Sequence, residues 1–222
     1  MRWPLRIFLV RHGQVASNIE MRYVGTRDEA LTDFGREQAR SVGAALAGLP
    51  IEAVVSSPLQ RAHWTAQQIA TGRGLEVRVD DRLREQSFGE WDGLSRDEVI
   101  ARDPEILVEW EKRDDVEPPG GESQIAMQKR VLTLVEEELE AAADRDGDEP
   151  RSVAFVSHVG PIKAVLSAAL DIGLMNGRRI FLDPATVSVV DWGEPPIVRV
   201  CNANIHGGLF HTRWISPDFL SS

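Results

Sequence analysis

The chain has 222 residues, of which 42% are hydrophobic and 27% are charged. This length and composition predict a single α/β domain, spanning residues 1–222, with a sizeable core. The formal net charge of -10 argues against a sequence-independent nucleic-acid surface, which needs clustered Lys and Arg. Cys201 is the only cysteine, so neither an intrachain disulfide nor a cysteine-based zinc site can form.

Strand and helix signals alternate along the first half of the chain. Apolar runs predict short buried strands at residues 6–10, 51–57 and 75–80. Between these runs, apolar residues recur at helical spacing over residues 31–49 and 58–70. Thr32 is the expected N-cap of the first helix, and Pro58 is expected in the first turn of the second.

The second half begins with an excursion over residues 83–115, which carries many charges, predicts only short helices and is closed by the turn PPGGES. Hydrophobic spacing then predicts two further helices and three strands. The helices are expected at residues 123–143 and 160–174, and the strands at residues 152–157, 186–192 and 196–202, the last two as a hairpin-like pair. An irregular tail is expected from Gly207.

This order of elements predicts an α/β three-layer sandwich, with a mostly parallel central sheet and helices on both faces. The opening stretch MRWPLRIFLV contains an apolar run that is too short for a secretion signal or a membrane span. We therefore expect a soluble, cytoplasmic protein with no membrane partner.

Polar residues follow the predicted strands at the points where they end. Arg11 and His12 end the first strand, Arg61 lies one turn into the helix after the second, and His158 follows the strand at 152–157. Ligands of such folds bind beyond the carboxyl ends of the strands. Cations gathered there beside a helix N-terminus suit a phosphate group, with Glu85 placed to reach the rim.

The same residues resemble a known family, the histidine phosphatase superfamily, also called the phosphoglycerate-mutase-like family. The first motif of that family is Arg-His-Gly at the end of the first strand, here Arg11, His12 and Gly13. Further matching residues and blocks follow in the order of the family: Asn18, Arg22, Gly25, Asp28, LTDFG, SSPLQRAHWTA, LREQSFGEWDGLS, PPGGES and VSHVG. Since these blocks span nearly the whole chain, their joint order is highly specific.

The resemblance implies a role for each strand-end residue. His12 would be the nucleophile that forms a phosphohistidine. Arg11 and Arg61 would clamp the phosphoryl oxygens, and His158, protonated beside the phosphate, would add a donor. Glu85 would be the proton donor to the leaving oxygen. Should Glu85 not be the acid, Asp28 and Glu122 are the next candidates.

The family pattern also implies substrate-binding residues, at Asn18, Arg22, Gly25 and Val159. Asn18 would donate to the phosphate or hold its loop. Val159 stands where most members have Gly, and its side chain would narrow the pocket. Positive side chains supply the electrophilic help in this chemistry, so no metal and no cofactor is expected.

The blocks LREQSFGEWDG and SHVGPIK resemble phosphatases that act on ribazole phosphate or glucosyl-phosphoglycerate, with Lys163 assigned to the surface. The predicted function is therefore hydrolysis of a small phosphomonoester. A cofactor-dependent phosphoglycerate mutase is the alternative, which the acid-rich segment 97–117 disfavours. A catalytically silent phospho-ligand-binding module is a third hypothesis, which the intact His12 and Glu85 disfavour. The sequence leaves homo-oligomerisation open.

The remaining histidines and the tryptophans are given no catalytic role. His63 is two residues beyond Arg61, so a helix turns it to another face, and His206 and His211 are expected on the surface. The tryptophans are assigned to core or lid packing rather than to base stacking: Trp64, Trp91 and Trp110. The acidic stretch at residues 144–149 is interpreted as a solvated turn rather than a calcium loop.

Overall fold

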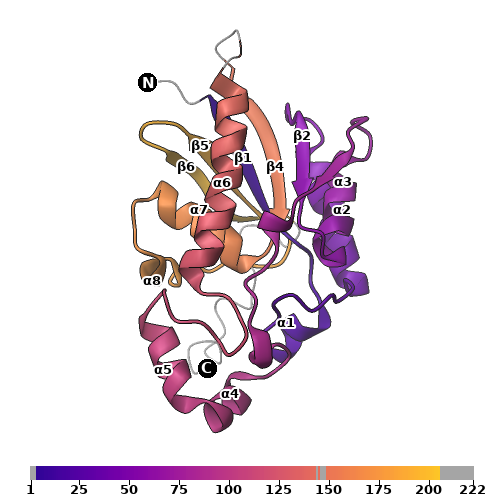
Figure 1. Cartoon of the computed structure of the whole chain (residues 1–222). Coiled ribbons are helices and arrows are strands. Elements are labelled where there is room, and N and C mark those ends of the chain that lie inside the picture. Colours follow the sequence, from indigo (N-terminus) through magenta and orange to yellow (C-terminus); the bar gives the residue numbers. More distant parts are fainter. Residues whose placement is uncertain (1–3, 144, 146–148, 206–222) are drawn as a thin grey trace.

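The computed structural model describes residues 4–143, 145 and 149–205, and these contain one six-stranded sheet (Figure 1). Across the sheet the strands run in the order β3-β2-β4-β1-β5-β6. Their bounds are β1 Leu5–Arg11, β2 Ala53–Ser56, β3 Val77–Val79, β4 Arg151–Ser157, β5 Thr186–Trp192 and β6 Ile197–Asn204. The pairs β1/β4, β2/β4 and β2/β3 are parallel, whereas β1/β5 and β5/β6 are antiparallel. The mostly parallel sheet and the terminal strand pair are thus confirmed.

Helices cover both faces of the sheet, as predicted (Figure 1). The bounds of the described α-helices are α1 Ala16–Glu20, α2 Asp33–Leu46, α3 Gln60–Ala70, α4 Arg96–Arg102, α5 Pro104–Lys112, α6 Gln124–Ala143, α7 Val159–Ala169 and α8 Leu174–Gly177. Two 3-10 turns, η1 Asp81–Leu83 and η2 Gly89–Trp91, follow β3. No described helix is long and apolar enough to cross a membrane.

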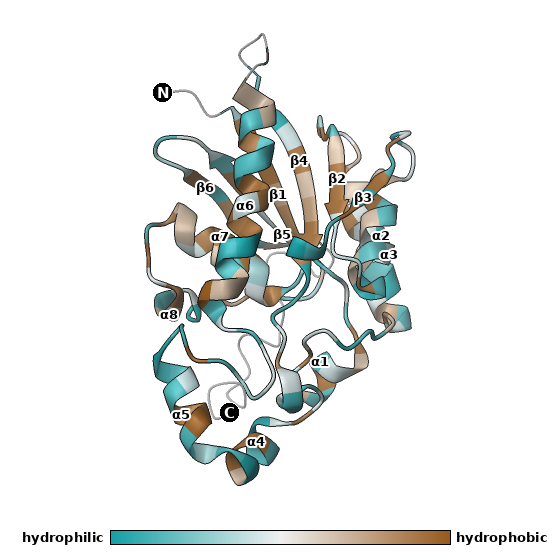
Figure 2. Ribbon diagram, viewed as in Figure 1, coloured by the Kyte–Doolittle hydropathy of each residue, from teal (hydrophilic) through white to brown (hydrophobic). Residues whose placement is uncertain are grey.

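The two faces follow from the alternation of side chains along the strands. On one face Leu5, Ile7 and Leu9 of β1 pack against α6 and α7. On the other, Phe8 and Val10 pack against α2 and α3. Figure 2 shows the central strands as hydrophobic and the covering helices as mixed. This double burial explains why the strand sequences are nearly continuous apolar runs.

Several predicted boundaries shift for local reasons. The helix expected from Pro58 begins at Gln60, because Leu59 is extended and the Asp28 side chain accepts a hydrogen bond from the backbone of Gln60 at 2.8 Å. The helix expected over 160–174 ends at Ala169, since Asp171 adopts a positive φ of 52°. Thr32 is the N-cap of α2, as predicted, and accepts from Gly35 at 3.0 Å.

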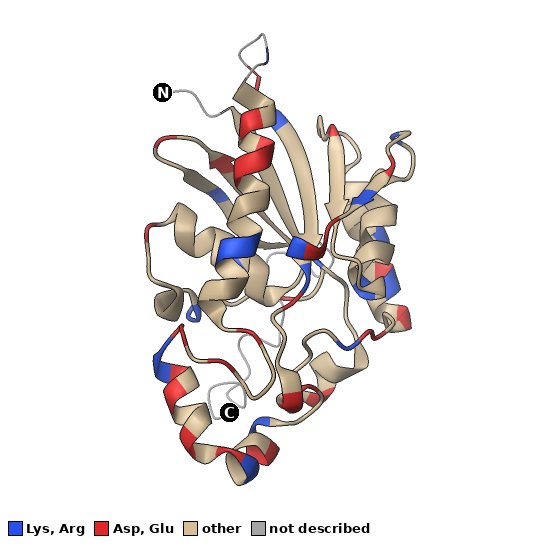
Figure 3. Cartoon of the chain, in the orientation of Figure 1, with Lys and Arg blue, Asp and Glu red and all other residues tan. Residues whose placement is uncertain are grey.

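The segment from η2 to α5, residues 89–112, forms a small cap beyond the carboxyl ends of the strands (Figure 1). Its own apolar cluster consists of Trp91, Val99 and Leu107, packed by partly buried neighbours that include Tyr23 and Trp110. Acidic residues are spread along α4 and α5 (Figure 3). The predicted packing role of Trp91 and Trp110 is confirmed, and the excursion is an ordered cap.

Candidate active site

The two strands that carry the histidines lie side by side in the sheet. Arg11 of β1 is in register with Ser157 of β4, and the backbone N–H of His12 donates to the carbonyl of Ser157 at 3.1 Å. His158 follows β4 as the N-cap of α7. As a result, the rings of His12 and His158 are only 5.0 Å apart.

The tautomer of His12 is set by its own loop. Nδ1 lies 2.7 Å from the carbonyl oxygen of Gly13, and because a carbonyl only accepts, Nδ1 must donate. Nε2 then carries the lone pair of a neutral imidazole. Burial, followed by the charges of Arg61 and Arg11, holds the pKa of His12 well below its usual value. The unprotonated, nucleophilic form is therefore favoured.

His158 is fully buried, and its Nε2 lies 2.8 Å from the hydroxyl of Ser57. Its Nδ1 has no hydrogen-bond partner within the described part of the chain. Burial, then Arg61 and His12, holds the pKa of His158 well below its usual value. The free site therefore favours a neutral ring, because burying the charged form is costly. Protonation of His158 beside a bound phosphate stays a prediction.

The two arginines are fixed by backbone carbonyls. Arg61, only 1% exposed, donates to Arg27 at 2.7 Å and to Gly25 at 2.8 Å, and Arg11 donates to Leu182 at 2.6 Å. The Nε of each guanidinium is buried without a hydrogen-bond partner in the described residues. Burial lowers the pKa of Arg11 to about 10, so it stays charged at neutral pH. Both guanidinium groups are thus held in place while each keeps an N–H donor that is not used by the described residues.

Glu85 closes the other side of the site. Its Oε1 accepts from the backbone of Gln86 at 2.9 Å and of Gly160, in the first turn of α7, at 3.0 Å. The residue is 8% exposed. Burial raises the pKa of Glu85, although backbone donors, Arg61 and Arg11 act in the opposite direction. A raised pKa favours the protonated carboxyl that a general acid needs.

Further residues that sequence reasoning missed hold Glu85 in position. Arg130 of α6 donates to the carbonyl of Glu85 at 3.1 Å and to that of Arg82 at 2.5 Å. The guanidinium of Arg130 also forms an ion pair with Glu122 at 2.8 Å. Ser57, the partner of His158, was also missed as a functional residue. These partners are distant in sequence, so no local pattern could reveal them; only the motif blocks around Ser57 and Glu122 gave a hint.

A cavity of about 180 Å³ brings most of the predicted residues together. It is lined by Arg11, His12, Val15, Asn18, Arg22, Val24, Arg61, Glu85, Phe88 and Val159. Asn18 accepts from the backbone N–H of Val15 at 3.1 Å through Oδ1, which leaves its amide N–H groups as donors. His158 lies behind this cavity, in contact with His12.

The other predicted binding residues take varied positions. Arg22 lines the cavity, but its guanidinium is held by Glu20, Glu98 and the carbonyl of Gly93. Gly25 lies behind the cavity, where its carbonyl anchors Arg61 and a Cβ would come within 2.6 Å of the Gln86 carbonyl oxygen. Val159 lines the wall beside Glu85.

The residues without an assigned role lie elsewhere. His63 is hydrogen-bonded to Gln67 at 3.3 Å on another face of α3. Several of the other segments lie outside the described residues: His206, His211, the tail from Gly207 and most of the acidic turn at 144–149. The alternative acids are engaged as well: Asp28 caps α3 and Glu122 pairs with Arg130. In the described ranges no three His, Cys, Asp or Glu side chains form a group that could hold a metal ion.

The lowered histidine pKa values can be tested directly. At a pH near the usual histidine pKa of about 6.5, ¹⁵N NMR of the free protein should show His12 and His158 predominantly neutral, because each pKa lies below that pH. Inorganic phosphate should raise the pKa of His158, since a dianion stabilises the imidazolium. Half-protonated rings in the free protein at this pH would contradict the assigned electrostatics.

Two histidines, two buried arginines and a buried carboxyl thus gather beyond the ends of the strands. The sequence model of the histidine phosphatase superfamily (branch 1) matches residues 7–202. The chain belongs to this superfamily, which confirms the resemblance found in the sequence.

The curated relatives of the chain include a named phosphatase. The chain is 32% identical over 209 residues to phosphoserine phosphatase 1 of Hydrogenobacter thermophilus, covering 93% of this chain and 96% of the relative. A bifunctional protein of Mycobacterium tuberculosis is 41% identical over 195 residues, 85% of this chain but 50% of the relative. The chain thus spans about half the length of that relative.

Solved structures agree with these matches. A mycobacterial glucosyl-3-phosphoglycerate phosphatase superposes with a TM-score of 0.80 at 33% identity, covering 90% of this chain and 99% of the other. A putative alpha-ribazole-5'-P phosphatase from Escherichia coli gives a TM-score of 0.80 at 26% identity, with 90% and 97% covered. The named homologues are phosphatases, which supports the predicted class of phosphoric monoester hydrolase.

Proposed function

We propose that the chain hydrolyses a small phosphomonoester through a covalent phosphohistidine on His12, without a metal ion. The observation that carries this proposal is the neutral Nε2 of His12 in a cavity shared with Arg11, Arg61 and a carboxyl of raised pKa. Such a site supplies a nucleophile, a charge clamp and an acid within one small volume.

The reaction would proceed in two in-line displacements. In the first, the lone pair of His12 Nε2 bonds to phosphorus as the bond to the leaving oxygen breaks, and that oxygen takes the proton of Glu85. In the second, a water attacks the phosphohistidine, returns a proton to Glu85 and restores His12. Unpaired donors of Arg11 and Arg61 would meet the charge that spreads over the phosphoryl oxygens. Once phosphate is bound, His158 would take up a proton and donate as well.

Hydrolysis is favoured over mutase chemistry by the charges of the cap. A mutase must grip a second strongly anionic group, but two of the cations in the acid-rich segment 97–117 are already paired with carboxylates. Arg102 pairs with Glu90 and Asp103, and Arg113 pairs with Glu109 and Asp115. A silent binding module would need neither the neutral nucleophile nor the acid of raised pKa. The relatives named for phosphoserine and glucosyl-3-phosphoglycerate suggest a small metabolite as the substrate.

Metal independence has a simple test. Phosphate release from phenyl phosphate should be unchanged after exhaustive treatment with EDTA, because the arginines and not a metal stabilise the transition state. The measurement is initial rate in chelator, with magnesium and zinc added back as controls. Activity lost in chelator and restored by either metal would overturn the metal-free mechanism. Transfer of phosphate to an alcohol in excess over its release to water would favour the mutase.

A further inference from the structure

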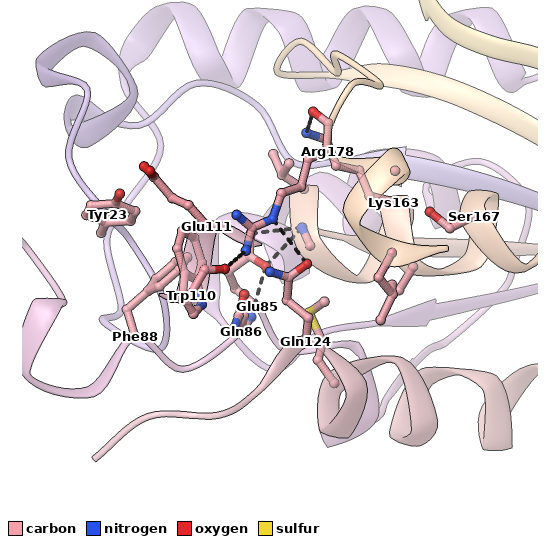
Figure 4. Close-up of a pocket in the computed structure, with 16 residues that line it drawn as sticks. Tyr23, Glu85, Gln86, Phe88, Trp110, Glu111, Gln124, Lys163, Ser167 and Arg178 are labelled. Atoms are coloured by element: carbon pink, nitrogen blue, oxygen red, sulfur yellow. Dashed lines mark hydrogen bonds between the residues drawn. The ribbon is translucent and has the colours of Figure 1, made fainter. Parts of the chain in front are cut away.

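A second cavity, of about 270 Å³, adjoins the one that holds His12, and Figure 4 shows the side chains around it. The two cavities share Glu85, Phe88 and Val159 in their walls. In the proposed reaction Glu85 protonates the leaving oxygen, so the alcohol part of the substrate must lie on the Glu85 side of the phosphate. The second cavity is therefore the place where the alcohol part of the ester would lie.

Arg178, just beyond α8, occupies the middle of this cavity (Figure 4). Its guanidinium stacks on Trp110 at 4.2 Å from the ring centre, and Nη2 donates to the carbonyl of Trp110 at 2.5 Å. With the Gln124 amide turned so that its oxygen faces the guanidinium, that oxygen accepts from Nε at 3.0 Å. Within the described residues no carboxylate pairs with Arg178, and Nη1 has no hydrogen-bond partner.

Lys163 of α7, expected at the surface, lines the same cavity and is only partly exposed. Its ammonium donates to the carbonyl of Arg178 at 3.3 Å and forms no ion pair with any described carboxylate. The hydroxyl of Ser167, one turn further along α7, is buried without a hydrogen-bond partner in the described part of the chain. Burial lowers the pKa of both cations, which means that an incoming anion would stabilise their charged forms.

The two carboxylates that line this cavity, Glu85 and Glu111, attract these cations but form no ion pair with them. Glu111 lines the wall, but its carboxylate pairs with Arg96 at 2.9 Å. Glu85 is the proton donor of the proposed reaction, and burial raises its pKa. The cavity therefore offers two cations that form no ion pair with a carboxylate of the described residues. Tyr23, Phe88 and Trp110 complete the cavity with an aromatic wall.

We infer that this second cavity selects phosphomonoesters whose alcohol carries a carboxylate, with Arg178 and Lys163 as the residues that recognise it. The inference rests on the proposed function, because it assigns the leaving group of that reaction. A carboxylate fits better than a second phosphate, since Arg178 has already committed Nε and Nη2 to the protein and keeps Nη1 for the ligand. The aromatic wall would cover the carbon chain between the carboxylate and the phosphate ester.

The test compares two esters that differ only in this charge: 3-(phosphonooxy)propanoate and its neutral amide. The unmodified protein should prefer the carboxylate by a factor on the order of ten in kcat/KM, mainly through a lower KM. In Arg178→Gln and in Lys163→Gln this ratio should fall towards one. Because the readout is a ratio, a general loss of activity in either variant cancels out.

Arg179→Gln is the matched control, since it removes the same charge from the neighbouring exposed position and should keep the ratio. If Arg178 only held the cap through Trp110, Arg178→Gln would lower kcat/KM for both esters alike, which would overturn the inference. Lys163→Gln leaves the contact between Arg178 and Trp110 intact. Equal kcat/KM for both esters in the unmodified protein, with phenyl phosphate still hydrolysed, would overturn the carboxylate subsite alone. No release of phosphate from any of the three esters would overturn the proposed function itself.

Discussion

Replacing His12 by alanine is expected to reduce phosphate release from phenyl phosphate by a factor on the order of 10⁴ or more, because the covalent step loses its nucleophile. The fold should survive, since His12 contributes one short contact to Gly13 and one ring contact to His158. The measurement is kcat under saturating substrate, with thermal unfolding as a check of folding. After a rapid quench that avoids acid, the peptide of the unmodified protein that contains His12 should be heavier by one phosphoryl group. The corresponding peptide of the variant should not.

His63→Ala is the control for this experiment, as it removes an imidazole from the outer face of α3 without touching the cavity. It should retain full activity and full labelling at His12. Substantial turnover in His12→Ala would refute the assignment. His158 would be a poor explanation of such turnover, because it does not line the cavity that holds His12.

Much of the fold could be predicted because local signals and burial agree. The strand at residues 6–10 reads as a continuous apolar run, and the structure buries it between two layers of helices. Thr32 predicts the start of α2, because threonine is a preferred residue at helix N-caps. The start of α3 could not be predicted in this way, because the group that accepts from Gln60 is Asp28, more than thirty residues earlier. Long-range caps of this kind leave no local pattern.

The site shows the same division between local and distant signals. The strand-end positions of Arg11, His12 and His158 follow from the order of elements, and the motif blocks add Arg61 and Glu85. Their protonation states do not follow from the sequence, because burial sets them. His158 is expected to be charged beside a bound phosphate, whereas burial of its ring and the charges of Arg61 and His12 favour the neutral form in the free site. The cavity that Lys163 lines could not be predicted either, because its walls come from segments far apart in the sequence.

The roles of Glu85 and of the two arginines can be separated by the leaving group. Glu85→Gln should slow an alkyl phosphate far more than p-nitrophenyl phosphate, because a poor leaving group needs a proton and a good one does not. Glutamine keeps the size of the side chain and an oxygen that can accept from Gly160, which at present donates to Oε1 at 3.0 Å. The variant therefore removes the acid while retaining the shape of the site.

Arg11→Ala and Arg61→Ala should instead lower kcat/KM for both esters by similar factors, on the order of 10²–10³. The reason is that the arginines act on the phosphoryl group, which is the same whichever leaving group departs. The measurement is kcat/KM for both esters in all three variants. Equal losses on the two esters in Glu85→Gln would show that Glu85 acts through its charge or position and not as the acid. Neither Asp28 nor Glu122 could then simply take its place, because Asp28 caps α3 and Glu122 is paired with Arg130, which itself holds the backbone of Glu85. A water held in the cavity would become the candidate donor, and its proton transfer would appear as a solvent isotope effect that persists in Glu85→Gln.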